Sequence, residues 1–106
     1  MITRDSIDEA ARVVVAAAAP AKVVLFGSHA RGDAGPDSDV DLLVIERDVP
    51  NRAQEMVRLR RLLRPLKIPV DLLVASEREV ADWGGLPGTV LYWALAEGEV
   101  LFEAAA

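Results

Sequence analysis

The chain has 106 residues, a formal net charge of −5, and a composition that is 52% hydrophobic and 27% charged. These values predict a single folded domain over residues 1–106 and exclude a disordered chain. The negative net charge argues against direct binding of nucleic acid through contacts with its phosphates. A bound metal cation would make the local charge positive and allow one anionic small molecule to bind. The sequence contains no cysteine, which excludes disulfides and thiolate zinc sites and fits a cytoplasmic protein.

The first predicted element is a helix from Thr3 to Ala19, capped by Thr3 or Asp5 and stopped by Pro20. Its apolar stripe repeats at intervals of three and four residues and consists of Ile7, Ala10, Ala11, Val14 and Ala18. The run VVVAAAAPA at its end resembles part of a secretory signal, but acidic residues precede it and it is too short to cross a bilayer. We therefore expect a soluble protein without a membrane partner.

Two strands and a loop follow. KVVLFG, from Lys22 to Gly27, predicts a short buried strand, and residues 27–38 predict a loop that has room for one helical turn. DVDLLVIE, from Asp39 to Glu46, predicts a second strand. Its apolar residues occupy both faces, which is typical of a central position in a sheet.

The second half alternates helices and strands. Residues 51–66 predict a helix whose core stripe is Met56, Leu59, Leu62, Leu63 and Leu66. Its arginines form a solvated face or, as the alternative, a surface for a partner. PVDLLVA, from Pro69 to Ala75, predicts a third strand, and SERE from Ser76 has the pattern of a capping box. Residues 89–97 predict a last helix and EVLFE, residues 99–103, a last strand. This order indicates a layered α/β domain.

Asp39 and Asp41 are the first candidates for chemistry. Side chains alternate along a strand, so these two carboxylates point to the same face, with Cα atoms about 7 Å apart. They repel each other unless a hard divalent cation lies between them, and Mg²⁺ binds one or two carboxylates together with substrate phosphates. A turn followed by an exposed strand start is the alternative interpretation of this segment.

Two further features bear on that choice. Gly27 and Ser28 end the first strand, where a glycine lets backbone N–H groups approach an anion and a serine hydroxyl can donate to phosphate; an ordinary turn is the other interpretation. Asp71 lies in a second copy of the pattern V-D-L-L-V. If the two V-D-L-L-V strands are neighbours, Asp71 joins Asp39 and Asp41 at one place on the sheet.

The stretch GSHARGDAGPDSDVD has Gly-Ser, ten residues and D-x-D, and so resembles the polymerase β-like nucleotidyltransferases. GSxARG followed by SDxDLLV is most similar to their minimal members, the MNT proteins, and the likeness extends over nearly the whole chain. It implies an α/β (α+β) fold with a small mixed sheet flanked by helices.

The resemblance also implies the roles of single residues in transferring a nucleotide to a hydroxyl. Asp39 and Asp41 would bridge two magnesium ions, and Asp71 would hold the ion nearest the acceptor and take its proton. Gly27 and Ser28 would position the phosphates of ATP. Arg31 either reaches the triphosphate or pairs with a loop aspartate, Asp33 or Asp37. We expect His29 to have a solvent-facing or packing role rather than a catalytic one.

MNT proteins are paired with HEPN-class toxins that cleave RNA, so the resemblance implies AMP transfer from ATP to a tyrosine of such a toxin. The chain would then be an antitoxin, within a homo- or hetero-oligomer. Two alternatives stay open: an antitoxin that acts by binding alone, and a stand-alone transferase that modifies a small molecule such as an aminoglycoside.

Overall fold

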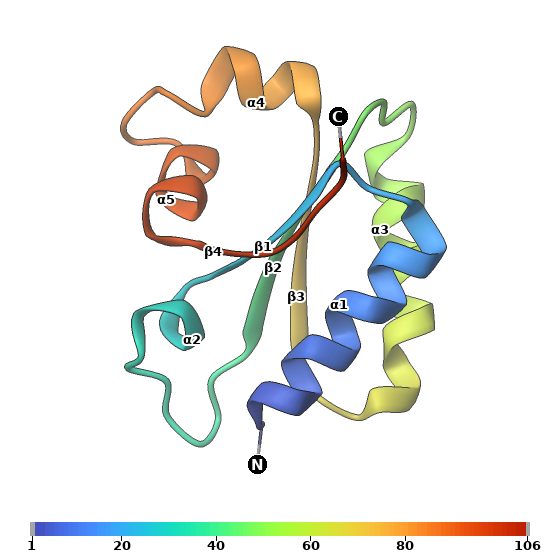
Figure 1. Cartoon of the computed structure of the whole chain (residues 1–106), viewed down its shortest axis with the longest axis vertical. Coiled ribbons are helices and arrows are strands. Elements are labelled where there is room, and N and C mark those ends of the chain that lie inside the picture. The colour runs from blue at the N-terminus through green and yellow to red at the C-terminus, as the bar shows by residue number, and fades with distance from the viewer. Residues whose placement is uncertain (1, 106) are drawn as a thin grey trace.

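The structure, a computed structural model, describes residues 2–105 as one mixed sheet with helices on both sides (Figure 1). The elements are α1 (Arg4–Ala18), β1 (Lys22–Phe26), α2 (Ser28–Arg31), β2 (Val40–Glu46), α3 (Arg52–Leu63), the 3-10 turn η1 (Arg64–Leu66), β3 (Val70–Ser76), α4 (Glu77–Trp83), α5 (Val90–Glu97) and β4 (Glu99–Glu103). In this part of the chain, no helix has both the length and the apolar character needed to cross a membrane.

The sheet has the strand order β3-β2-β1-β4. β2 pairs with β3 in parallel, whereas β1 pairs with β2 and with β4 in antiparallel fashion. Figure 1 shows α1 and α3 on one side of this sheet, and α2, α4 and α5 on the other. The predicted mixed sheet flanked by helices is therefore confirmed, as is the central position of the strand that follows Asp39.

Each side of β2 contributes to a different hydrophobic core. Val40, Leu42 and Val44 belong to the larger cluster, which α1 and α3 cover. Leu43 and Ile45 belong to a smaller cluster, which includes residues of α4 and α5. Burial on both faces explains why this strand is a continuous apolar run without polar alternation.

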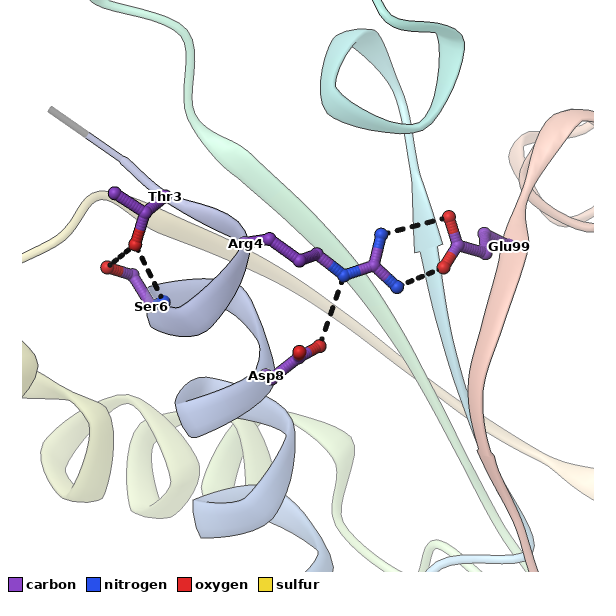
Figure 2. Close-up of polar contacts among 5 residues, drawn as sticks. All are labelled: Thr3, Arg4, Ser6, Asp8 and Glu99. Carbon is purple, nitrogen blue, oxygen red and sulfur yellow. Dashed lines mark hydrogen bonds and ion pairs between the residues drawn. The ribbon is translucent and has the colours of Figure 1, made fainter.

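The helix ends carry the signals that the sequence predicted. Thr3 caps α1 by accepting a hydrogen bond from the backbone N–H of Ser6 at 3.1 Å (Figure 2). Arg4 then hydrogen-bonds the Glu99 carboxylate, which joins the first turn of α1 to β4. At α4, Ser76 and Glu79 form the predicted capping box, with hydrogen bonds of 3.1 and 3.0 Å.

The predicted helix over residues 51–66 differs from the observed one in two respects. α3 ends at Leu63 and tightens into η1, because Pro65 has no N–H to continue the α-helical hydrogen bonds. Leu62, which we expected in the core, is 44% exposed. The buried stripe runs through Leu59 and Leu63, and Leu62 lies about 100° around the helix from Leu63.

β2 ends at a carboxylate with an unusual environment. Oε2 of Glu46 is buried and has no hydrogen-bond partner among the described residues. Burial, together with the neighbouring Glu55 carboxylate, raises the pKa of Glu46 from its usual 4.5 to about 7, although Arg58 opposes this. Between these two pH values the folded chain holds a proton that the unfolded chain has lost. The stability of the fold therefore falls as the pH rises through this window.

We predict that Glu46→Gln, which removes the charge and keeps the size, raises the free energy of unfolding by about 1 kcal/mol at pH 8. At pH 5 the gain disappears, because Glu46 is then protonated in the folded wild type. Urea unfolding at both pH values measures the difference, with exposed Asp48→Asn as the control. An equal effect at both pH values would contradict the assignment.

Candidate active site

The three predicted aspartates lie at one end of the sheet. β2 and β3 run parallel, and their register pairs Asp41 with Asp71, so adjacent strands bring these residues about 4.8 Å apart at Cα. Asp39 lies two residues before Asp41, just outside β2. Asp71 and Leu73 are two residues apart on β3 and therefore point to the same side of the sheet. Leu73 packs in the cluster that includes residues of α4 and α5, so both paired aspartates face that side. The two V-D-L-L-V strands are thus neighbours, which is the condition under which Asp71 joins the other two aspartates.

Electrostatic repulsion marks this end of the sheet. Asp41 is half-buried, whereas Asp39 and Asp71 are exposed. Burial raises the pKa of Asp41, and the negative charges of Asp71 and Asp39 raise it further, while His29 and Arg31 act in the opposite direction. The carboxylates are therefore close enough to repel one another, and a bound cation would relieve that repulsion.

Gly27 makes room for the carboxylate of Asp41. Its φ is +74°, a conformation that other residues rarely adopt. A Cβ at this position would overlap Oδ2 of Asp41 and would lie 3.0 Å from its Cγ. The Gly27 carbonyl accepts hydrogen bonds from the N–H groups of Ala30 and Arg31 at 3.1 and 3.0 Å. Glycine is thus required both by the backbone turn into α2 and by the position of Asp41.

His29 connects α2 to the aspartate loop. Its Nε2 lies 3.1 Å from the carbonyl oxygen of Ser38, and because a carbonyl only accepts, Nε2 carries the hydrogen. Ser38 precedes Asp39, and its Oγ also accepts a hydrogen bond from the N–H of Gly35 at 2.9 Å. The structure thus gives His29 a packing and anchoring contact, as we expected.

Arg31 makes the loop contact that the sequence left open, together with one that the sequence gave no sign of. Its Nε donates to Asp33 at 3.3 Å, and its Nη1 donates to Glu97, at the end of α5, at 3.1 Å. Glu97 lies 66 positions away in the sequence, and no local pattern links the two residues. A contact between Arg31 and a triphosphate stays a prediction.

The aspartate side chains share one end of the sheet but do not converge. Over residues 2–105, no group of three or more His, Cys, Asp or Glu side chains has an arrangement that could hold a metal ion. Asp71 instead has its Oδ1 3.9 Å from Nη2 of Arg60, a residue that we had placed on the solvated face of α3. Asp39 and Asp71 are exposed, so other rotamers are open to them. As a donor set, three carboxylates fit a hard cation such as Mg²⁺.

We predict that Gly27→Ala lowers the free energy of unfolding by about 3 kcal/mol, because it combines backbone strain with overlap of the Asp41 carboxylate. Gly32→Ala is the matched control: its φ is +84°, but nothing lies within 4 Å of the added methyl group. It should cost about 1 kcal/mol.

Urea unfolding in an Asp41→Ala background isolates the overlap. There the cost of Gly27→Ala should fall to that of Gly32→Ala. Equal costs for the two alanine variants in the wild-type background would show that Asp41 does not press on Gly27.

Comparison with known proteins gives a family. Residues 7–91 match the nucleotidyltransferase domain family. A 54-residue stretch is 33% identical to a Methanocaldococcus jannaschii protein named "Putative protein adenylyltransferase" and covers 51% of this chain. The match spans 54% of that relative, or about half of its length.

Solved structures are similar over most of the chain. A Sulfolobus solfataricus protein described as a "putative nucleotidyltransferase" is 29% identical, with a TM-score of 0.60 over 92% of this chain and 86% of its own. A toxin–antitoxin structure with AMP-PNP has a TM-score of 0.64 at 19% identity over 92% and 73% of the two chains. A mutant of the toxin–antitoxin MntA-HpeT has a TM-score of 0.61 at 17% identity over 97% and 75%.

The last two likenesses concern the fold alone. The family match, by contrast, covers most of the sequence and includes Gly27, Ser28 and the three aspartates. This protein belongs to the nucleotidyltransferase domain family.

Proposed function

We propose that this chain transfers AMP from ATP, with Mg²⁺, to a tyrosine hydroxyl of a HEPN-class toxin, and thereby acts as an antitoxin. The observation that carries the proposal is the position of Asp41, in register with Asp71 and pressed against the Gly27 turn. The archaeal relative is named as a protein adenylyltransferase, and two similar structures are toxin–antitoxin assemblies, one of them with AMP-PNP. These names support the choice of nucleotide and partner.

Asp39, Asp41 and Asp71 are the residues that would hold magnesium. Their donor set is oxygen only, and the repulsion that raises the pKa of Asp41 is the kind that a cation relieves. When bound, two magnesium ions supply positive charge at the α-phosphate and at the leaving pyrophosphate.

The chain's own groups bind and orient the nucleotide. The Gly27 carbonyl occupies the N–H groups of Ala30 and Arg31, so the donors at the start of α2 that would bind the β- and γ-phosphates are the N–H groups of Ser28 and His29 and the Ser28 hydroxyl. Arg31 adds positive charge near Asp41. These donors fix the triphosphate so that its α-phosphorus faces the acceptor.

The transfer step is a displacement at the α-phosphorus. The acceptor oxygen forms a bond to this phosphorus, the bond to the β-phosphate oxygen breaks, and pyrophosphate leaves. Asp71 takes the proton of the acceptor hydroxyl, for which its exposed carboxylate at the strand edge is accessible. AMP thus becomes attached to the acceptor through a phosphodiester bond.

The proposed acceptor is a second protein. An RNA-cleaving toxin needs basic surface, and the net charge of −5 favours its approach to this chain.

The test is the intact mass of the toxin after incubation with this chain, ATP and Mg²⁺. We predict a gain of one or more AMP units, and a rate at least about 100-fold lower with the Asp39→Asn, Asp41→Asn double variant. Asp48→Asn, at the opposite end of β2, is the control and should act like the wild type.

Measuring RNA cleavage by the toxin in the same samples separates catalysis from binding. If the toxin gains no mass but is silenced equally by the wild type and the double variant, neutralisation by binding alone replaces the transferase proposal.

A further inference from the structure

Both tryptophans of the chain are exposed on the same segment. Trp83, at the end of α4, is 52% exposed, and Trp93, in α5, is 56% exposed. Leu86 and Val90 lie between them in the sequence and are 47% and 61% exposed. We call these four residues the tryptophan surface. Tryptophan is buried to a high degree in most folded proteins, so an exposed pair with two further apolar residues indicates an interaction site.

Hydrogen bonds hold this segment in a defined shape. The N–H of Leu86 donates to the Trp83 carbonyl at 3.1 Å, and the Thr89 hydroxyl lies within 3.2 Å of the Trp83 carbonyl and 2.9 Å of the Leu86 carbonyl. Thr89 also caps α5 through the N–H of Tyr92. Val90 and Trp93 are three residues apart on α5 and so share one side of that helix. The surface is therefore preformed, which lowers the entropic cost of binding.

One ion pair links the helix that carries Trp93 to the helix beside the aspartate site. Trp93 and Glu97 are four residues apart on this helix, and Glu97 binds Arg31 of α2. Leu43 and Leu73, each two residues after one of the paired aspartates, pack in the cluster that contains residues of α4 and α5, and Figure 1 shows both helices on that side of the sheet. A molecule seated on the tryptophan surface thus lies on the same side of the sheet as the aspartates.

The charge pattern indicates what kind of partner fits. Residues 83–96 contain no charged side chain, and the charged residues that bound this stretch, Asp82 and Glu97, are both acidic. Arg78, the only cation of α4 and α5, lies 3.9 Å from Asp82. An apolar, aromatic centre without charge is the composition of an interface core. Both acidic residues have an arginine partner, so the preference for a partner with a basic border rests on the net charge of −5 of the chain.

A second copy of the chain fits less well. A two-fold interface places the same patch on both sides, so the acidic ends of the stretch would face each other between two chains that each carry −5.

We propose that the tryptophan surface docks the protein that supplies the acceptor hydroxyl, and that this partner offers an apolar groove bordered by lysine and arginine. The inference rests on the proposed function, because it takes the acceptor to be a protein. Trp93 is its central contact, since tryptophans in the middle of an interface contribute much of the binding free energy.

Fluorotryptophan labelling tests this directly, because the chain has two tryptophans and both lie on the surface. Fluorine NMR of the labelled chain should show both signals shifting when the unlabelled partner toxin is added. Calorimetric titration should show that Trp93→Ala binds the toxin at least about 10-fold more weakly. The matched control is Leu62→Ala, an exposed apolar residue of α3 on the other side of the sheet, which should change affinity less than about 2-fold.

The outcomes separate docking from catalysis. The docking proposal is overturned if the wild type does not bind the toxin, if its fluorine signals stay unchanged, or if Trp93→Ala binds and modifies the toxin like the wild type. Signals that shift with the concentration of the chain alone would assign the surface to a second copy instead. Shifts and weakened binding without AMP on the toxin would keep the docking surface and end the transferase proposal.

Discussion

The close contact between the Asp41 carboxylate and the backbone of Gly27 determines how the rest of the site is built. The carboxylate occupies the space that a side chain at position 27 would need. The positive φ of Gly27 turns the chain out of β1 and into α2, whose first residue is Ser28. The antiparallel register of β1 and β2, which pairs Phe26 with Asp41, places this turn beside the carboxylate. One residue without a side chain thus joins two strands and a helical turn at the place where the chemistry is proposed to occur.

One side of the sheet contains most of the hydrophobic core, and the other side carries the aspartates. The side covered by α1 and α3 contains the larger cluster of buried residues, which includes Val40, Leu42 and Val44. Burial of this apolar surface stabilises the fold by about 25 cal/mol per Å². This gain offsets the repulsion between the carboxylates at one end of the sheet. The side covered by α4 and α5 has a smaller core and carries the aspartates. The repulsion among the aspartates therefore lies on the side of the sheet where substrate is proposed to bind.

The sequence predicts those features that depend on local or strictly repeated patterns. The two V-D-L-L-V segments align from Val40 with Val70 to Val44 with Val74, so the repeat places Asp41 beside Asp71 once the two strands pair. Caps are predictable because a cap needs a few adjacent residues. The exposure of Leu62 was not predictable, because packing against distant elements decides how far α3 is rotated about its axis. The contacts of Arg60 and Arg31 with acidic partners were not predictable either. Exposed ion pairs contribute little free energy and leave no pattern in the sequence.

The central claim is that Asp39, Asp41 and Asp71 form a nucleotide site that depends on a divalent cation. Calorimetric titration of the chain with AMP-PNP, with and without Mg²⁺, tests this most directly. We predict that Mg²⁺ tightens binding of the wild type at least about 10-fold and that Asp41→Asn loses this dependence. Asp41→Asn should unfold at no lower a temperature than the wild type, because it removes a carboxylate whose pKa is raised by burial and repulsion. Asp37→Asn, an exposed aspartate of the same loop, is the control. Binding that is equally tight with and without Mg²⁺, or unchanged in Asp41→Asn, would contradict the account.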